Sequence, residues 1–124
     1  MADEKNISSI LNSIKKNLNI SEDLEVFDSD LLLHLNSVFS KLNQIGVGPE
    51  EGFYVEDAET TWDEYYTDVS LGMIKSYVFL EVRLLFDPPT ASVLTSMEKT
   101  RDELVWRLNV AADRPIDRTN QNDY

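Results

Sequence analysis

Residues 70–86 read SLGMIKSYVFLEVRLLF, and Asp87-Pro88-Pro89 follows directly. The apolar side chains of this run recur every three or four residues. They are Leu71, Ile74, Val78, Val82 and Leu85, with Tyr77 and Leu84 beside them. This spacing is typical of one face of an α-helix, and the apolar strip is wide. The pattern therefore predicts a helix over about 70–86 that lies at the centre of the fold.

The Asp87-Pro88-Pro89 sequence predicts both the end of this helix and the start of the next. A residue that precedes proline is pushed out of the helical region, and proline cannot donate a hydrogen bond to the preceding turn. Asp87 can then cap the following helix, with Pro88 at its first position. Residues at helical spacing extend that helix to about Ala112: Leu94, Met97, Arg101, Leu104, Val105 and Leu108.

Two further helices are predicted upstream. The first covers about 6–18, because Ile7, Ile10, Leu11, Ile14 and Leu18 form one apolar strip. The second begins at Asp28, which can serve as its N-cap, and Gly46 is well placed to end it. Its apolar residues are Leu31, Leu35, Val38, Leu42 and Ile45, with Leu32 and Phe39 beside them.

Residues 47–60 contain glycine, proline and many acidic residues, and they are predicted to form a long loop with a short extended piece at Phe53-Tyr54-Val55. Thr61 and Glu64 have the spacing of a capping box, which predicts a short helical turn. No lysine or arginine occurs between Lys41 and Lys75. The loop is therefore acidic. It is either a solvated loop or a wall that repels passing DNA or pairs with a basic partner. The acidic residues that would form such a wall are Glu50, Glu51, Glu56, Asp57 and Glu59.

These patterns predict an all-α protein with four main helices, an acidic loop between the second and third, and a C-terminal tail. Residues 1–112 form a single helical domain, and residues 113–124 contain too few apolar side chains to pack. We expect this tail to be disordered in the free subunit and to become ordered on docking, although an idle terminus is the alternative. Its candidate docking residues are Arg114, Ile116, Arg118 and Tyr124.

Composition argues against several classes of function. The formal net charge is −12, whereas capture of DNA depends on basic residues that displace counterions from phosphate. Cysteine is absent, which excludes disulfides, thiolate nucleophiles and zinc sites built on cysteine. The sequence shows neither a membrane span nor a secretory signal, so a protein that is soluble and intracellular when made is expected.

No residue pattern indicates catalysis, a cofactor or a metal. His34, the only histidine, lies between leucines without further ligands, and Asp28 and Asp30 lack the other positions of a calcium loop. Gly46-Val47-Gly48 is not followed by the lysine of a phosphate-binding loop. We therefore expect a protein that is not an enzyme.

Aromatic and arginine side chains are candidates for contacts between subunits. Trp62, Tyr65 and Tyr66 lie near the acidic loop and either anchor it to the core or form hot spots at an interface. Arg83 and Arg101 lie on or near apolar helix faces. Each should have a carboxylate partner within the subunit or across a subunit boundary, because an unpaired cation there is costly.

Several segments, in order along the chain, resemble one known family. They are Asn36-Ser37-Val38-Phe39, residues 44–53 (QIGVGPEEGF), Lys75-Ser76-Tyr77, residues 83–89 (RLLFDPP) and Trp106-Arg107-Leu108-Asn109. This arrangement is similar to the head-to-tail connector, or adaptor, proteins of tailed bacteriophages that infect Gram-positive hosts, a family also associated with DNA packaging. The resemblance implies a structural subunit of the virion neck that forms a ring, usually a dodecamer. Such a ring docks below the portal protein, extends the DNA channel, and joins the head to the next connector or tail-completion protein.

A function of another class is a small acidic inhibitor that mimics DNA and occupies a basic site on a host enzyme. Composition alone permits it. Such a mimic needs carboxylates over much of its surface, whereas the first and fourth predicted helices also carry basic residues, namely Lys15, Lys16, Lys99, Arg101 and Arg107.

Overall fold

The computed structural model describes residues 9–112 as four α-helices and a single turn of 3-10 helix. The elements are α2 (Ile10–Asn17), α3 (Asp28–Gln44), η1 (Trp62–Glu64), α4 (Leu71–Phe86) and α5 (Ala91–Ala112). Within the described residues no strand is formed, and one isolated antiparallel bridge joins Ser9 to Thr61. The all-α prediction is confirmed. Residues 6–8 of the first predicted helix and the whole tail at 113–124 lie outside the described residues.

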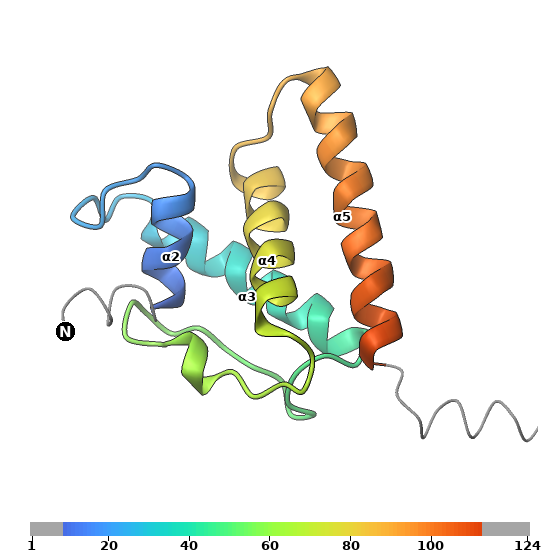
Figure 1. Ribbon diagram of the computed structural model, residues 1–124. Coiled ribbons are helices and arrows are strands. Elements are labelled where there is room, and N and C mark those ends of the chain that lie inside the picture. Colours follow the sequence, from blue (N-terminus) through green and yellow to red (C-terminus); the bar gives the residue numbers. More distant parts are fainter. Residues whose placement is uncertain (1–8, 113–124) are drawn as a thin grey trace, which may run out of the picture.

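Helix α4 is the central helix, as predicted. It contacts each of the other three α-helices. Figure 1 shows α5 running antiparallel beside it, α2 on its other side, and α3 crossing the group. Ile74, Val78 and Val82 are fully buried on α4. The hydrophobic core therefore lies where α4 meets α3 and α2, and α5 adds one fully buried side chain, Leu108.

The end of α3 is set by Gly46, as predicted. Gly46 has a φ of +89°, a left-handed conformation that glycine adopts without steric cost. Its amide donates to the carbonyl of Asn43 at 3.0 Å, and the amide of Val47 donates to that of Leu42 at 2.9 Å. This is the Schellman arrangement, and both Leu42 and Val47 are buried beside it. The chain leaves the helix in a fixed direction.

The prediction that Asp28 caps α3 is wrong. The N-cap residue is Phe27, and no side chain there accepts a hydrogen bond from the helix. The carboxylate of Asp28 instead lies 2.7 Å from the ammonium group of Lys15, whose side chain is 1% exposed. That ammonium also donates to the carbonyl of Glu22 at 3.1 Å. A buried cation without a partner destabilises the fold more than do helix-end amides that remain in contact with water. The carboxylate of Asp28 therefore pairs with Lys15 and does not cap α3.

The start of α5 also differs from the prediction. The helix begins at Ala91 rather than Pro88, and the amide of Leu94 donates to the carbonyl of Thr90 at 2.8 Å. Asp87 is engaged at the end of α4, where its amide donates to the carbonyl of Arg83 at 2.9 Å. Pro88 precedes Pro89 and is therefore itself disfavoured in the helical region. The two prolines form the turn between α4 and α5.

Candidate functional site

The acidic loop, residues 47–60, is held in shape by two asparagines of α3. The side chain of Asn36 accepts from the amide of Val55 at 2.7 Å and donates to its carbonyl at 3.0 Å. The side chain of Asn43 donates to the carbonyl of Pro49 at 2.9 Å. Asn36 thus satisfies both backbone groups of buried Val55, as a neighbouring strand would. The predicted extended piece at Phe53-Tyr54-Val55 pairs with a side chain and forms no strand.

Glycine allows the loop to approach the core closely. Gly48 has a φ of +94°, and a Cβ atom at this position would lie 2.5 Å from the hydroxyl oxygen of Tyr65. That hydroxyl donates to the carbonyl of Val47 at 3.3 Å. Burial of the Tyr65 side chain raises its pKa, which keeps the hydroxyl protonated. The loop therefore rests on Tyr65 through contacts that a side chain at Gly48 would block.

Aromatic rings fasten the loop to the helices. Phe39 of α3, Phe53 of the loop and Tyr65 form a cluster with ring centroids 4.9–5.1 Å apart. The indole N–H of Trp62 donates to the hydroxyl of Ser13 in α2 at 3.2 Å. Trp62 and Tyr65 are only 2% and 5% exposed. They are core anchors, and this burial replaces the expectation that they contact another subunit; Tyr66, 75% exposed, still presents its ring to the surface.

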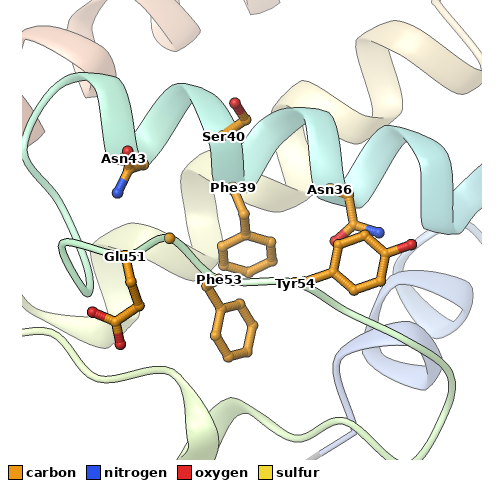
Figure 2. A pocket seen from close by; sticks show the side chains of 8 residues that line it. Asn36, Phe39, Ser40, Asn43, Glu51, Phe53 and Tyr54 are labelled. Carbon is orange, nitrogen blue, oxygen red and sulfur yellow. The ribbon is translucent and has the colours of Figure 1, made fainter.

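A groove runs between α3 and the loop, with a volume of about 420 Å³. Figure 2 shows Asn43 and Glu51 at one end, Phe39 and Phe53 in the middle, and Asn36 with Tyr54 at the other end. Its lining residues are Asn36, Phe39, Ser40, Asn43, Glu51, Gly52, Phe53 and Tyr54. We call this feature the loop groove. It has an apolar floor, polar walls and one carboxylate at an end.

The acidic residues of the loop are all at the surface. Glu50, Glu51, Glu56, Asp57 and Glu59 are exposed. The carboxylate of Asp57 accepts from the amide of Glu59 at 2.8 Å, which tightens the turn. At the end of the loop the carboxylate of Glu64 accepts from the amide of Thr61 at 2.9 Å, as the predicted capping box requires. The loop is therefore a fixed acidic surface.

A buried carboxylate that the sequence analysis missed joins three helices. Glu81 of α4 is 3% exposed and lies 3.0 Å from the guanidinium of Arg101 in α5 and 3.5 Å from the ammonium of Lys41 in α3. The hydroxyl of Tyr77 donates to the same carboxylate at 3.2 Å. One signal was available: Glu81 is the only acidic residue in the apolar run at 71–86.

The pKa values of its neighbours reflect this burial. Desolvation raises the pKa of Tyr77, and the charge and hydrogen bond of Glu81 raise it further. Burial alone would lower the pKa of Arg101, but hydrogen bonds and charge interactions with Asp102 and Glu81 raise it. The expected carboxylate partners of both candidate arginines lie within the subunit: Glu81 and Asp102 for Arg101, and Asp87 for Arg83 at 3.9 Å.

Two exposed apolar surfaces lie on different sides of α4. The first, the α5 surface, consists of Trp106 and Val110, one helical turn apart, and Trp106 is 67% exposed. The second, the α2–α3 surface, consists of Leu24 and Val26 in the connection before α3 and Leu33 in α3; Val26 is 71% exposed. In Figure 1 the connection between α2 and α3 and helix α5 lie at opposite sides of the molecule. Single exposed apolar residues are common on protein surfaces, and these two groups on unlike faces are candidates for contact surfaces.

Residues 9–112 show neither a candidate metal site nor a candidate membrane span. They contain no group of three side chains suited to a metal ion. His34 packs its ring against Phe86, with centroids 6.4 Å apart. None of the helices in residues 9–112 has the length and apolar character needed to cross a membrane.

A comparison with protein-family models matches residues 10–115 to the family described as phage connector protein. Comparisons with curated proteins and with solved structures gave no significant match. The matched region covers all four described α-helices, the acidic loop and both exposed apolar surfaces. The chain therefore belongs to the phage connector protein family.

Proposed function

We propose that this connector protein forms a closed ring, a dodecamer in the virion, that docks below the portal protein and joins the DNA-filled head of the phage to its tail. Family membership supports a structural virion component that associates with other head and tail proteins, in place of an acidic inhibitor. The ring, the portal contact, the next connector or tail-completion protein, and a Gram-positive host belong to the proposal.

The observation that carries the ring is the pair of exposed apolar surfaces on opposite sides of the subunit. In a cyclic ring of three or more subunits, one face of each subunit contacts a different face of its neighbour. The α5 surface and the α2–α3 surface are two such unlike faces. The α2–α3 surface is bordered by exposed Glu22, Asp23 and Glu25, which an adjoining α5 can meet with exposed Lys99.

The acidic loop suits the wall of a DNA channel. Its five exposed carboxylates repel phosphate, so DNA can pass without being held. The tail, residues 113–124, belongs to the same proposal as a segment that docks on the portal or on an adjacent subunit through Arg114, Ile116, Arg118 and Tyr124. Tyr66 is the aromatic candidate that remains exposed for contacts between subunits.

Electron microscopy of the purified protein mixed with its cognate portal tests this function. We expect rings seated on the portal for the natural chain and their loss for Trp106→Asp and for Leu33→Asp, which place a charge on each apolar surface. Thr100→Asp, at an exposed position of the same helix, is the matched control and should leave the rings intact. Rings from both surface variants, or no ring from the natural chain, would contradict the proposal.

A further inference from the structure

The loop side of the groove presents backbone groups that no described residue pairs. The amides of Gly52 and Val55 are hydrogen-bonded, to the carbonyl of Pro49 and to the side chain of Asn36. The backbone groups of Phe53 and Tyr54 between them make no hydrogen bond to another described residue. An extended edge with free donors and acceptors beside an apolar floor is the arrangement that accepts an added peptide strand.

The end of α5 lies close to one end of this groove. A Cβ atom on Gly46 would be 3.6 Å from the Cβ of Ala112, the last residue of α5. The side chain of Asn109 also donates to the carbonyl of Ile45 at 3.5 Å. Asn43, which lines the groove, precedes Gly46 by one helical turn, or about 5 Å. Two extended residues span about 7 Å, so residue 114 reaches the groove.

The residues that follow Ala112 match the groove in length and charge. Along α3 the groove runs from Asn43 back to Asn36, about 10 Å of helix. Three to four extended residues cover that length. In an extended chain Arg114, Ile116 and Arg118 lie on one face, because side chains alternate. Arg114 then meets Glu51, Ile116 meets the floor at Phe39 and Phe53, and Arg118 meets exposed Tyr54 and Glu56.

We infer that in the free subunit residues 114–118 bind as an extended strand in the loop groove of their own chain. Attachment to α5 gives this segment a high effective concentration at the groove, which favours the chain's own tail over that of a second copy. This inference differs from the expectation of a disordered tail that the sequence analysis gave. Residues 114–118 would then have to leave the groove before they could dock on a partner during assembly. Only this release during assembly rests on the proposed function.

The full-length chain contains no cysteine, so a pair of introduced thiols reports the contact without background. Ser40→Cys places one thiol at an exposed position in the groove, and Ile116→Cys places the other on the face of the tail that is proposed to meet the groove. The second pair combines Ile116→Cys with Ser29→Cys, at an exposed position in the first turn of α3. Each double variant is equilibrated with a glutathione redox buffer at micromolar protein, after circular dichroism has shown an unchanged helical signal.

We expect the groove pair to form an intramolecular disulfide with an effective concentration at least about tenfold above that of the second pair. Arg114→Glu with Arg118→Glu, added to the groove pair, should lower its effective concentration several-fold, and so should a salt concentration of about 1 M. Because Ser40 lies nearer to Ala112 than Ser29 does, an idle terminus also favours the groove pair. An effective concentration in the groove pair that neither the charge reversal nor the salt lowers would therefore show an idle terminus and overturn the inference. Disulfide-linked dimers whose yield rises with protein concentration would also overturn it, because the tail would then bind a second copy. Neither result depends on ring formation. Failure of this inference can therefore be told apart from failure of the proposed function, which the portal experiment tests.

Discussion

The guanidinium of Arg101 in α5 lies 3.0 Å from the carboxylate of Glu81 in α4, which is only 3% exposed. Leu108 is the single fully buried apolar residue of α5, and Leu104, Val105, Ala111 and Ala112 pack against the core partly buried, so this ion pair adds to an apolar contact. Lys41 of α3 approaches the same carboxylate, which brings three helices to one charge. The pair helps to fix the α5 surface relative to the rest of the subunit.

The first prediction concerns this ion pair. Arg101→Ala should lower the free energy of unfolding by about 2 kcal/mol, because it leaves a buried carboxylate with weaker compensation while Lys41 remains. Arg107→Ala removes an exposed pair with Glu103 at 3.2 Å and should change stability by about 0.5 kcal/mol or less. Urea denaturation of both variants measures the difference. Equal losses would show that Glu81 is not held mainly by Arg101.

The second prediction concerns the asparagine that holds the loop. Asn36→Ala leaves the amide and carbonyl of Val55 without partners, and it should cost about 2 kcal/mol of unfolding free energy. Hydrogen exchange at the Val55 amide should become faster in the variant. Ser37→Ala, at an exposed neighbouring position, is the control and should alter neither quantity. Unchanged protection at Val55 in Asn36→Ala would contradict the role assigned to this side chain.

The third prediction separates backbone strain from steric conflict. Gly48 and Gly52 both have a φ of +94°, but only at Gly48 would a Cβ atom collide with Tyr65. Gly52→Ala should therefore cost about 1 kcal/mol through strain alone, and Gly48→Ala should cost distinctly more. Thermal unfolding monitored by circular dichroism gives the comparison. Similar losses in the two variants would mean that Tyr65 moves aside without cost.

The fourth prediction concerns alkaline pH. Burial raises the pKa of Tyr65 and Tyr77 above the ordinary tyrosine value of about 10. Their contribution to stability is fully present below about pH 10 and is lost as the pH rises further, because the unfolded chain ionises first. The free energy of unfolding should fall with a shallower slope in Tyr65→Phe than in the natural chain. An equal slope in the two proteins would contradict a raised pKa of Tyr65 in the folded chain.

The fifth prediction concerns DNA. The purified protein should not retard duplex DNA in a gel at physiological salt, because its net charge of −12 opposes counterion release. Replacing Glu56, Asp57 and Glu59 by lysine should slow DNA ejection if the loop lines the channel. Micromolar binding by the natural chain that weakens with salt would contradict the first part. An unchanged phage titre for the triple variant would leave the loop as a solvated surface.

Sequence periodicity predicted the helices well because most of the buried residues of each helix lie on one apolar strip. The run at 70–86 gave the central helix to within one residue at its start, and Gly46 ended α3 as expected. The capping box at Thr61 and Glu64 was also confirmed, since it depends on residues three positions apart. Local signals therefore sufficed wherever the partners are close in sequence.

Sequence reasoning failed where distant charges compete with local preferences. Asp28 is a good N-cap by residue type, yet its carboxylate pairs with Lys15 from another helix. The burial of Glu81 depends on Arg101 and Lys41, which lie on two other helices. The loop groove likewise needs α3 and residues 51–54 to be brought together. Such contacts are set by tertiary structure, so no spacing rule reveals them.

The way in which the acidic loop is anchored separates its shape from its charge. Its path depends on Asn36, Asn43 and Tyr65, all outside the loop, and on glycines within it. Its five acidic residues are exposed, and the carboxylate of Asp57 also tightens a turn. Mutation can therefore change the electrostatic character of this surface step by step while the fold remains intact. The charge of this surface can thus be varied by substitution without first having to make the subunit more stable.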